Sequence, residues 1–186
     1  MATSSVEICN SALYKIGAAR IAALSDETKS ARMLNDQYDR KRKEVLRSHP
    51  WNFAIVRANL VALTSVPAWG FSMEFQIPND CLRILEIDAQ DSEWMREGNV
   101  VRTDTSTLSV LYVSSSTQPG QYDACFSEVF ATKLAADVCY AITQSVSLAD
   151  ALDKKYKDLL REARSFDAQE GGTRQVYARE WLNSRS

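Results

Sequence analysis

The side chains best suited to catalysis in this sequence are one histidine, His49, and four scattered cysteines. A serine or cysteine hydrolase needs a base beside its nucleophile, and histidine is the usual base. His49 directly precedes Pro50 and Trp51 at the expected end of a helix, where its ring is better suited to hydrogen-bond the last helical carbonyls. The cysteines are Cys9, Cys81, Cys125 and Cys139. They form no C-x-x-C pair and no Cys/His cluster of the kind that binds zinc, so we expect reduced, apolar thiols.

Motifs for other chemistry are missing from the sequence. There is no Walker-type loop and no glycine-rich dinucleotide fingerprint, so nucleotide phosphates have no recognisable binding loop. Glu86 and Asp88 fall on one face of an expected strand. A glycosidase or an aspartic-type enzyme needs two acids in contrasting environments at a cleft, and nothing singles out such a pair. The sequence therefore predicts a protein that is not an enzyme, with no catalytic residues, no cofactor and no metal site.

The densest group of basic side chains is Arg40, Lys41, Arg42 and Lys43. Acids surround it at Asp36, Asp39 and Glu44, and the whole chain has a formal charge of −2. A dedicated nucleic-acid binder gains affinity by neutralising phosphates with clustered Lys and Arg, so this balance argues against one. We favour a solvated helix face for the cluster. An inter-subunit salt-bridge patch and a weak contact with a polyanion are the alternatives.

The first ten residues, MATSSVEICN, lack the basic and apolar regions of a signal peptide. No uninterrupted apolar run approaches the ~18 residues of a membrane helix. We therefore expect a protein made and folded in a cytosol, with no membrane partner.

Apolar residues at helical spacing predict four helices. Their expected N-terminal caps are, in chain order, Ser4 or Ser5, then Ser25 or Asp26, then Asp123, then a capping box of Ser147 with Asp150. The first helix should stop at Gly17 and the second at Arg47, before Pro50.

Between the second and third helices, β-branched and aromatic residues predict strands. The clearest is Phe71–Ile77, in which apolar and polar residues alternate. The other expected strands are Trp51–Ala58, Cys81–Asp88, Asn99–Arg102 and Thr107–Val113. Because no crossover helix fits between them, we expect a meander of four or five antiparallel strands.

This order of elements predicts an α+β fold, in which an antiparallel bundle of about four helices carries an inserted antiparallel β lobe. Residues 1–50 and 122–168 would form the bundle, 51–121 the β-rich lobe, and 169–186 a C-terminal extension. We expect Trp51 and Phe53 to be core anchors between bundle and lobe.

The C-terminal extension follows a Gly171-Gly172 pair and contains Tyr177, Trp181 and Leu182, which would share one face of a helix. So short a segment cannot bury these side chains by itself. It either folds back onto the bundle or docks on another subunit as a helix in a groove. We favour docking, because a double glycine is typical of a hinge.

Four segments of the sequence together resemble one known family. They are residues 12–26, 31–54, 75–83 and 130–136, and the most specific parts are HPWNFA at 49–54 and PNDCLR at 78–83. In this order and spacing they resemble the tail tubular protein A family of short-tailed phages, over roughly residues 5–168.

The resemblance implies a head-to-tail adaptor, a structural protein of the virion tail that is assembled in the host cytoplasm. Twelve identical subunits would form a ring between the portal protein on one side and the nozzle protein or tail fibres on the other. Genomic DNA would pass the lumen without specific binding. The family implies the same bundle-and-lobe fold and has no catalytic residues to carry over.

Two sets of side chains are the candidates for contacts with the portal or with neighbouring subunits. They are Arg174, Tyr177, Trp181 and Leu182 in the extension, and Arg40, Lys41, Arg42 and Lys43 in the basic cluster. The alternative function is a small DNA-binding or packaging accessory protein that uses the basic cluster.

Overall fold

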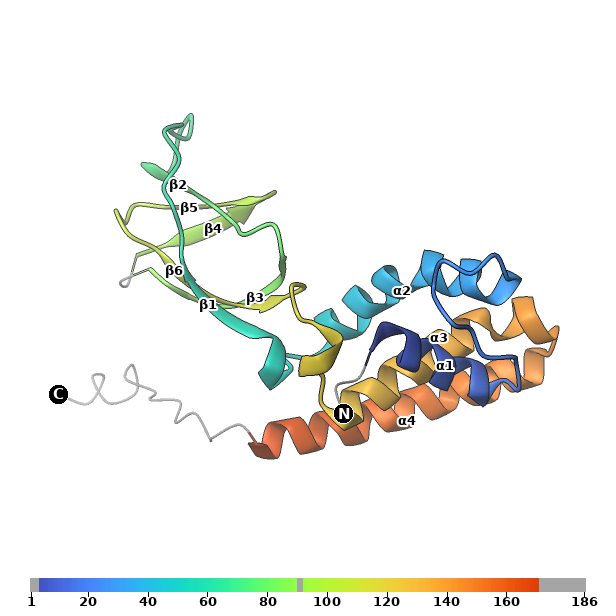
Figure 1. Ribbon diagram of the computed structural model, residues 1–186. Coiled ribbons are helices and arrows are strands. Elements are labelled where there is room, and N and C mark those ends of the chain that lie inside the picture. Colours follow the sequence, from blue (N-terminus) through green and yellow to red (C-terminus); the bar gives the residue numbers. More distant parts are fainter. Residues whose placement is uncertain (1–3, 90–91, 171–186) are drawn as a thin grey trace.

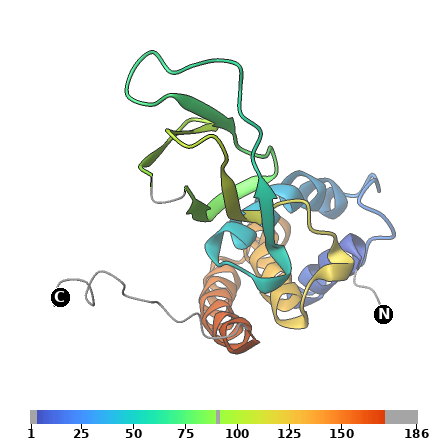
Figure 2. The same cartoon turned by 90° about the vertical axis from the view of Figure 1, so that its left-hand side faces the viewer.

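The computed structural model describes residues 4–89 and 92–170 and has the expected α+β architecture. The described helices are α1 (Ser5–Lys15), α2 (Lys29–Ser48), α3 (Ala124–Thr143) and α4 (Val146–Glu170). They pack as a bundle, and a β lobe is inserted between α2 and α3. Figures 1 and 2 show the lobe at one end of the bundle, where α2 ends and α3 begins.

The first helix begins as the sequence predicts. The Ser4 hydroxyl accepts a hydrogen bond from the Glu7 amide at 3.1 Å, and the Glu7 carboxylate accepts one from the Ser4 amide at 2.7 Å. This reciprocal capping box satisfies two amides that the helix itself leaves unpaired. After the helix, Gly17 turns the chain with a positive φ of 69°, a conformation that glycine adopts without strain.

The predicted caps of the second and fourth helices are wrong. Thr28 caps α2, accepting from the Ala31 amide at 3.2 Å, because the Asp26 carboxylate already accepts from the amides of Ala22 and Ala23. The fourth helix begins at Val146, one residue before the predicted cap. There the Ser145 hydroxyl accepts from the Leu148 amide at 3.3 Å.

The strands form two three-stranded antiparallel sheets rather than a meander, so that prediction is also wrong. One sheet has the order β1 (Ile55–Asn59), β6 (Ser109–Ser114), β3 (Cys81–Asp88). The other has the order β2 (Met73–Gln76), β5 (Val100–Thr103), β4 (Trp94–Glu97). Strand β6 lies between two strands that precede it in the chain, and it pairs with both.

Two local features of the lobe were not predicted. Strand β4 is joined to β5 by the two-residue turn Gly98-Asn99, in which Gly98 has a φ of 59°. The segment after Trp51 begins as a short 3₁₀ helix, Asn52–Ala54, and becomes a strand only at Ile55. The Ala54 amide donates to the Trp51 carbonyl at 2.8 Å, which closes that turn.

Two hydrophobic clusters organise the described part of the chain. The bundle core is built around Trp51, Phe126 and Phe130, and Val113 at the end of β6 belongs to it. Phe53 is partly buried and packs against the same core. The smaller lobe core consists of Phe75, Ile77, Ala89, Val101 and Leu108. Strand β6 spans the distance between the two cores, because Leu108, directly before it, belongs to the lobe core and Val113, near its end, belongs to the bundle core.

Candidate functional site

His49 lies at the junction of the bundle and the lobe, in a different role from the predicted one. Its Nε2 is 3.0 Å from the Asp167 carboxylate on α4, and the same carboxylate accepts from the Asn52 amide at 3.0 Å. The expected hydrogen bonds from His49 to the last carbonyls of α2 are not the ones formed. Arg164 donates to the Ser48 carbonyl at 2.8 Å, and the Trp51 indole donates to the Val45 carbonyl at 3.0 Å.

Burial lowers the pKa of His49 below its ordinary value, while the hydrogen bond with Asp167 acts in the opposite direction. The imidazole is therefore neutral at pH 7, and its edge meets the Trp51 ring at a centroid distance of 4.9 Å. The neutral His49 ring contacts Trp51 on one side and the Asp167 carboxylate on the other, so it connects α4 with the junction.

The four cysteines are free thiols at separate places. Cys9 and Cys139 are buried in the bundle, and Cys81 and Cys125 are half-buried. Burial raises the pKa of Cys9 to about 12, so this thiol stays protonated at neutral pH. Within residues 4–89 and 92–170, no three His, Cys, Asp or Glu side chains come together to hold a metal ion.

Glu86 and Asp88 line a hollow of about 660 Å³ that is bordered by residues of β1, β6 and β3. In the strand register, Arg57 and Glu86 lie on either side of Leu111. Both carboxylates interact with other groups. The hollow is polar, and Arg57 lines it together with these two acids.

Two side chains of the basic cluster are exposed to solvent and the other two are largely covered by the protein. Arg40 and Lys43 are exposed, as expected for a solvated helix face, and Lys43 pairs with Asp39 at 2.7 Å. Lys41 and Arg42 instead point toward the protein, with side chains only 14% and 13% exposed. The expectation of a solvated face is therefore wrong for these two residues.

Lys41 belongs to a network of four charges between α2 and α3. It pairs with Asp137 and, at 3.2 Å, with Glu44 on its own helix. Lys133 completes the network, at 3.3 Å from Glu44 and 3.6 Å from Asp137. Each charge has two neighbours of opposite sign, so the removal of any one leaves two like charges that share a single opposite charge instead of two.

This network predicts an acid-sensitive contribution from Glu44. Partial burial raises the pKa of Glu44, but Lys41 and Lys133 outweigh it and hold the carboxyl below its ordinary value of 4.5. Because the folded-state pKa is depressed, the stabilisation is present above pH 4.5 and is lost as the pH falls further. We expect Glu44→Gln to lose less of its free energy of unfolding than the unsubstituted protein between neutral and acidic pH, measured by urea unfolding.

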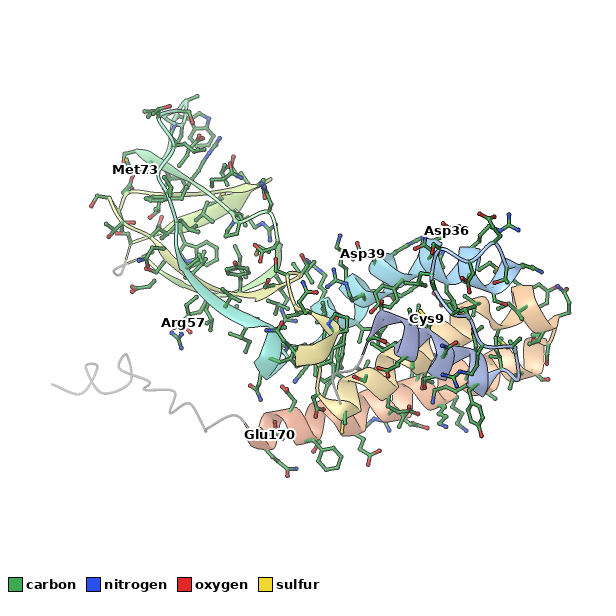
Figure 3. The ribbon with its side chains drawn as sticks, in the orientation of Figure 1. Cys9, Asp36, Asp39, Arg57, Met73 and Glu170 are labelled. Atoms are coloured by element: carbon green, nitrogen blue, oxygen red, sulfur yellow. The ribbon has the colours of Figure 1, made fainter. Side chains whose placement is uncertain are left out.

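The matched control is Asp36→Asn, on the same helix. Asp36 is exposed, and Figure 3 shows it on the outer side of α2. This variant should keep the acid dependence of the unsubstituted protein. An identical pH profile for Glu44→Gln would contradict the role assigned to the network.

Arg42 fixes the segment that leads from the lobe into α3. Its Nη1 donates to the Ser115 carbonyl at 2.7 Å and to the Thr117 carbonyl at 3.4 Å. Its Nη2 donates to the Asp39 carboxylate at 2.7 Å, which orients the guanidinium. The same segment is held from the lobe side, where the Asp80 carboxylate accepts from the hydroxyls of Ser114 and Ser116.

A run of exposed apolar side chains lies on the loop between β1 and β2, and sequence reasoning missed it. In this loop Val61 is 76% exposed, Val66 71% and Trp69 86%. Residues 60–72 contain no charged side chain, and that is the signal that would have found the surface. Exposed apolar side chains gathered on one loop are a feature of many interaction sites. Tyr14 on α1 is a second case, at 85% exposed.

The other candidate interface residues, Arg174, Tyr177, Trp181 and Leu182, lie outside the described residues. None of the helices in the described part of the chain has the length and apolar character needed to cross a membrane. No model of a known protein family matches the chain, and a search of curated proteins finds no match to it.

Proposed function

We propose that this protein is a head-to-tail adaptor of a short-tailed phage. In this proposal twelve copies form a ring between the portal protein and the tail nozzle or fibres, around the channel for genomic DNA. The protein acts by binding its neighbours and performs no chemistry.

The observation that carries the proposal is where the two most family-specific segments lie. Residues 49–54 and 78–83 both lie at the junction of bundle and lobe. From the first, Trp51 enters the bundle core and His49 contacts Asp167. From the second, Leu82 packs against the bundle core and its carbonyl accepts from Arg47. The resemblance therefore falls on residues that set how bundle and lobe are joined, which supports a shared architecture.

The surface of the subunit also suits assembly. A ring of identical subunits needs two different surfaces on each copy, because each contact is head-to-tail. Trp69 in the lobe and Tyr14 in the bundle are large apolar side chains that are more than four-fifths exposed. Neighbouring proteins that covered them would remove apolar area from water, which favours association.

The charge of the subunit suits a channel that DNA must leave. Each copy has a formal charge of −2, so twelve copies would carry about −24. An acidic ring repels phosphates and would not retain the genome. The DNA-binding alternative relies on Arg40, Lys41, Arg42 and Lys43. Since Lys41 and Arg42 are engaged by internal partners, we prefer the adaptor.

The test is to mix the purified full chain with portal rings and image the product by electron microscopy. We expect twelve-fold density added to one face of the portal. A chain ending at Glu170 should remain folded by circular dichroism and add no density, because it lacks Tyr177 and Trp181. A portal left unchanged by the full chain would refute the proposal, and tight duplex binding near physiological salt in a filter assay would favour the alternative.

A further inference from the structure

An apolar groove lies between the first turns of α3 and the last turns of α4. Its volume is about 260 Å³. Its apolar lining consists of Ala124, Cys125 and Val129 from α3 and Leu159, Ala163 and Phe166 from α4. We call this surface the α3–α4 groove.

The groove exists because small side chains face each other where the two helices meet. Ala124 and Ala163 leave space that larger residues would fill, and Phe166 stands at the edge with 46% of its surface exposed. Farther along the same helix pair, Leu152 and Tyr156 are buried. The packing of α4 against α3 is therefore looser at Phe166 than at Leu152 and Tyr156.

We propose that the C-terminal segment of the same chain, residues 173–185, docks in the α3–α4 groove of the free subunit. In a helix, Tyr177 and Trp181 are one turn apart on one face, and their rings would supply the apolar surface that the groove lacks. This inference does not depend on the adaptor function, since a free subunit suffices for it.

The length of the chain beyond α4 fits this occupant. Ala163, at the floor of the groove, precedes Glu170 by seven residues, or about 10 Å of helix. Seven further residues lead from Glu170 to Tyr177 and span up to about 23 Å when extended. Gly171-Gly172 supplies backbone freedom for the reversal that docking requires. Figure 3 labels Glu170 at the end of α4, where the segment begins.

The opposite charges of the C-terminal segment and of the rest of the chain also favour docking of this segment. Residues 171–186 contain three arginines and one glutamate, a formal charge of +2, so the remainder of the chain carries −4. The groove has Glu128 and Glu162 among its lining residues; Glu128 also pairs with Lys15 of α1, whereas Glu162 is exposed. Arg174 precedes Tyr177 by three residues and Arg185 follows Trp181 by four, so both would lie on the apolar face of the helix, toward these carboxylates.

Tethering favours the segment of the same chain over that of a second copy. A segment joined by a short flexible linker has an effective concentration of the order of millimolar at its site. At micromolar protein, the same chain therefore has about a thousandfold advantage over another molecule.

Cys125 makes the proposal testable in the full chain, because this half-buried thiol lines the groove. Native-state alkylation followed by peptide mass spectrometry would compare the unsubstituted protein with the double variant Tyr177→Ala, Trp181→Ala. We expect the double variant to be alkylated at Cys125 about tenfold faster, with an unchanged rate at Cys81 in the lobe, since an open groove exposes only the first thiol.

The matched control is Val176→Ala with Asn183→Ala, two changes on the opposite face of the same helix, which should leave the Cys125 rate unchanged. Equal Cys125 rates in the double variant and the unsubstituted protein would overturn the proposal. Protection that disappears when the protein is diluted from about 100 µM to 1 µM would assign the groove to a second copy and would also overturn it.

Alkylation of the buried Cys9 and Cys139 would reveal whether the double variant unfolds. If it does, a disulfide experiment tests the proposal in its place. Ala178→Cys lies on the docking face, and oxidation should join it to Cys125 within one chain. The control Asn183→Cys, on the opposite face, should not cross-link. No bond from position 178, or one between two chains, would refute docking in the same molecule. Portal binding is measured separately, so this result and the adaptor test can fail independently.

Discussion

Replacing Trp51 by alanine is expected to lower the free energy of unfolding by about 3–5 kcal/mol, as for other large-to-small changes at buried aromatic residues. The Trp51 side chain is 1% exposed and its ring centroid lies 5.1 Å from that of Phe126. The substitution also leaves the Val45 carbonyl without its indole donor. Because domains are stable by only about 5–15 kcal/mol, a large part of the fold's stability depends on this side chain. Urea unfolding followed by circular dichroism measures the change.

The chain contains a matched control for this experiment in Trp69→Ala. Trp69 is 86% exposed, so its removal creates no cavity and should change the free energy of unfolding by less than about 0.5 kcal/mol. Similar losses in the two variants would mean that Trp51 is not the anchor of the bundle core.

Arg42→Ala is expected to lower the free energy of unfolding by about 1.5–3 kcal/mol, the range for hydrogen bonds to a charged group. The guanidinium donates to the carbonyls of Ser115 and Thr117, and without it these acceptors lose their charged partner. The loss should be local as well as global, because the two carbonyls lie on the segment that joins the lobe to α3. Urea unfolding would measure the first effect and amide hydrogen exchange at residues 115–118 the second.

Arg40→Ala, two positions earlier on the same helix, is the control for Arg42→Ala. Arg40 is exposed, and its removal should leave both unfolding and hydrogen exchange unchanged within about 0.5 kcal/mol. If both variants behaved alike, the inward orientation of Arg42 would not matter to the fold. The pair also separates structure from DNA binding, since a phosphate-binding role would be carried by exposed Arg40.

The helices were predictable because their information is local. Apolar spacing and the capping box of Ser4 and Glu7 involve residues a few positions apart, and the structure has both. The cap at Thr28 was missed because the choice between it and Asp26 depends on which amides each side chain reaches. Asp26 bonds backward to Ala22 and Ala23, and that leaves α2 to begin after Thr28.

The strand pairing was not predictable from the alternation of apolar and polar residues. This pattern indicates that a segment is a strand and which of its faces is buried, but it does not indicate which strand lies next to it. Strand β6 pairs with β1 and β3, separated from it by intervening strands in the chain. Strand β4 escaped prediction for a different reason. All four of its residues are exposed, so no buried face imposes a pattern on Trp94–Glu97. Only the Gly98-Asn99 pair signals the hairpin.

The candidate interface was only partly accessible from the sequence for the same reason. Lys41 and Arg42 look like members of a solvated basic run until α3 is packed against α2. Asp137, the partner of Lys41, is far away in the sequence and is brought close only by tertiary packing. The uncharged stretch at 60–72 was visible in the sequence, but only the fold shows that Val61, Val66 and Trp69 within it are exposed.

The two connections between bundle and lobe run through β1 and β6, which are hydrogen-bonded neighbours. A third strand reinforces them, because Leu82 of β3 packs against the bundle core and its carbonyl accepts from Arg47. Arg42 fixes the segment at the base of β6. A force on the β2–β5–β4 sheet would therefore reach the helices through three hydrogen-bonded strands that share the load.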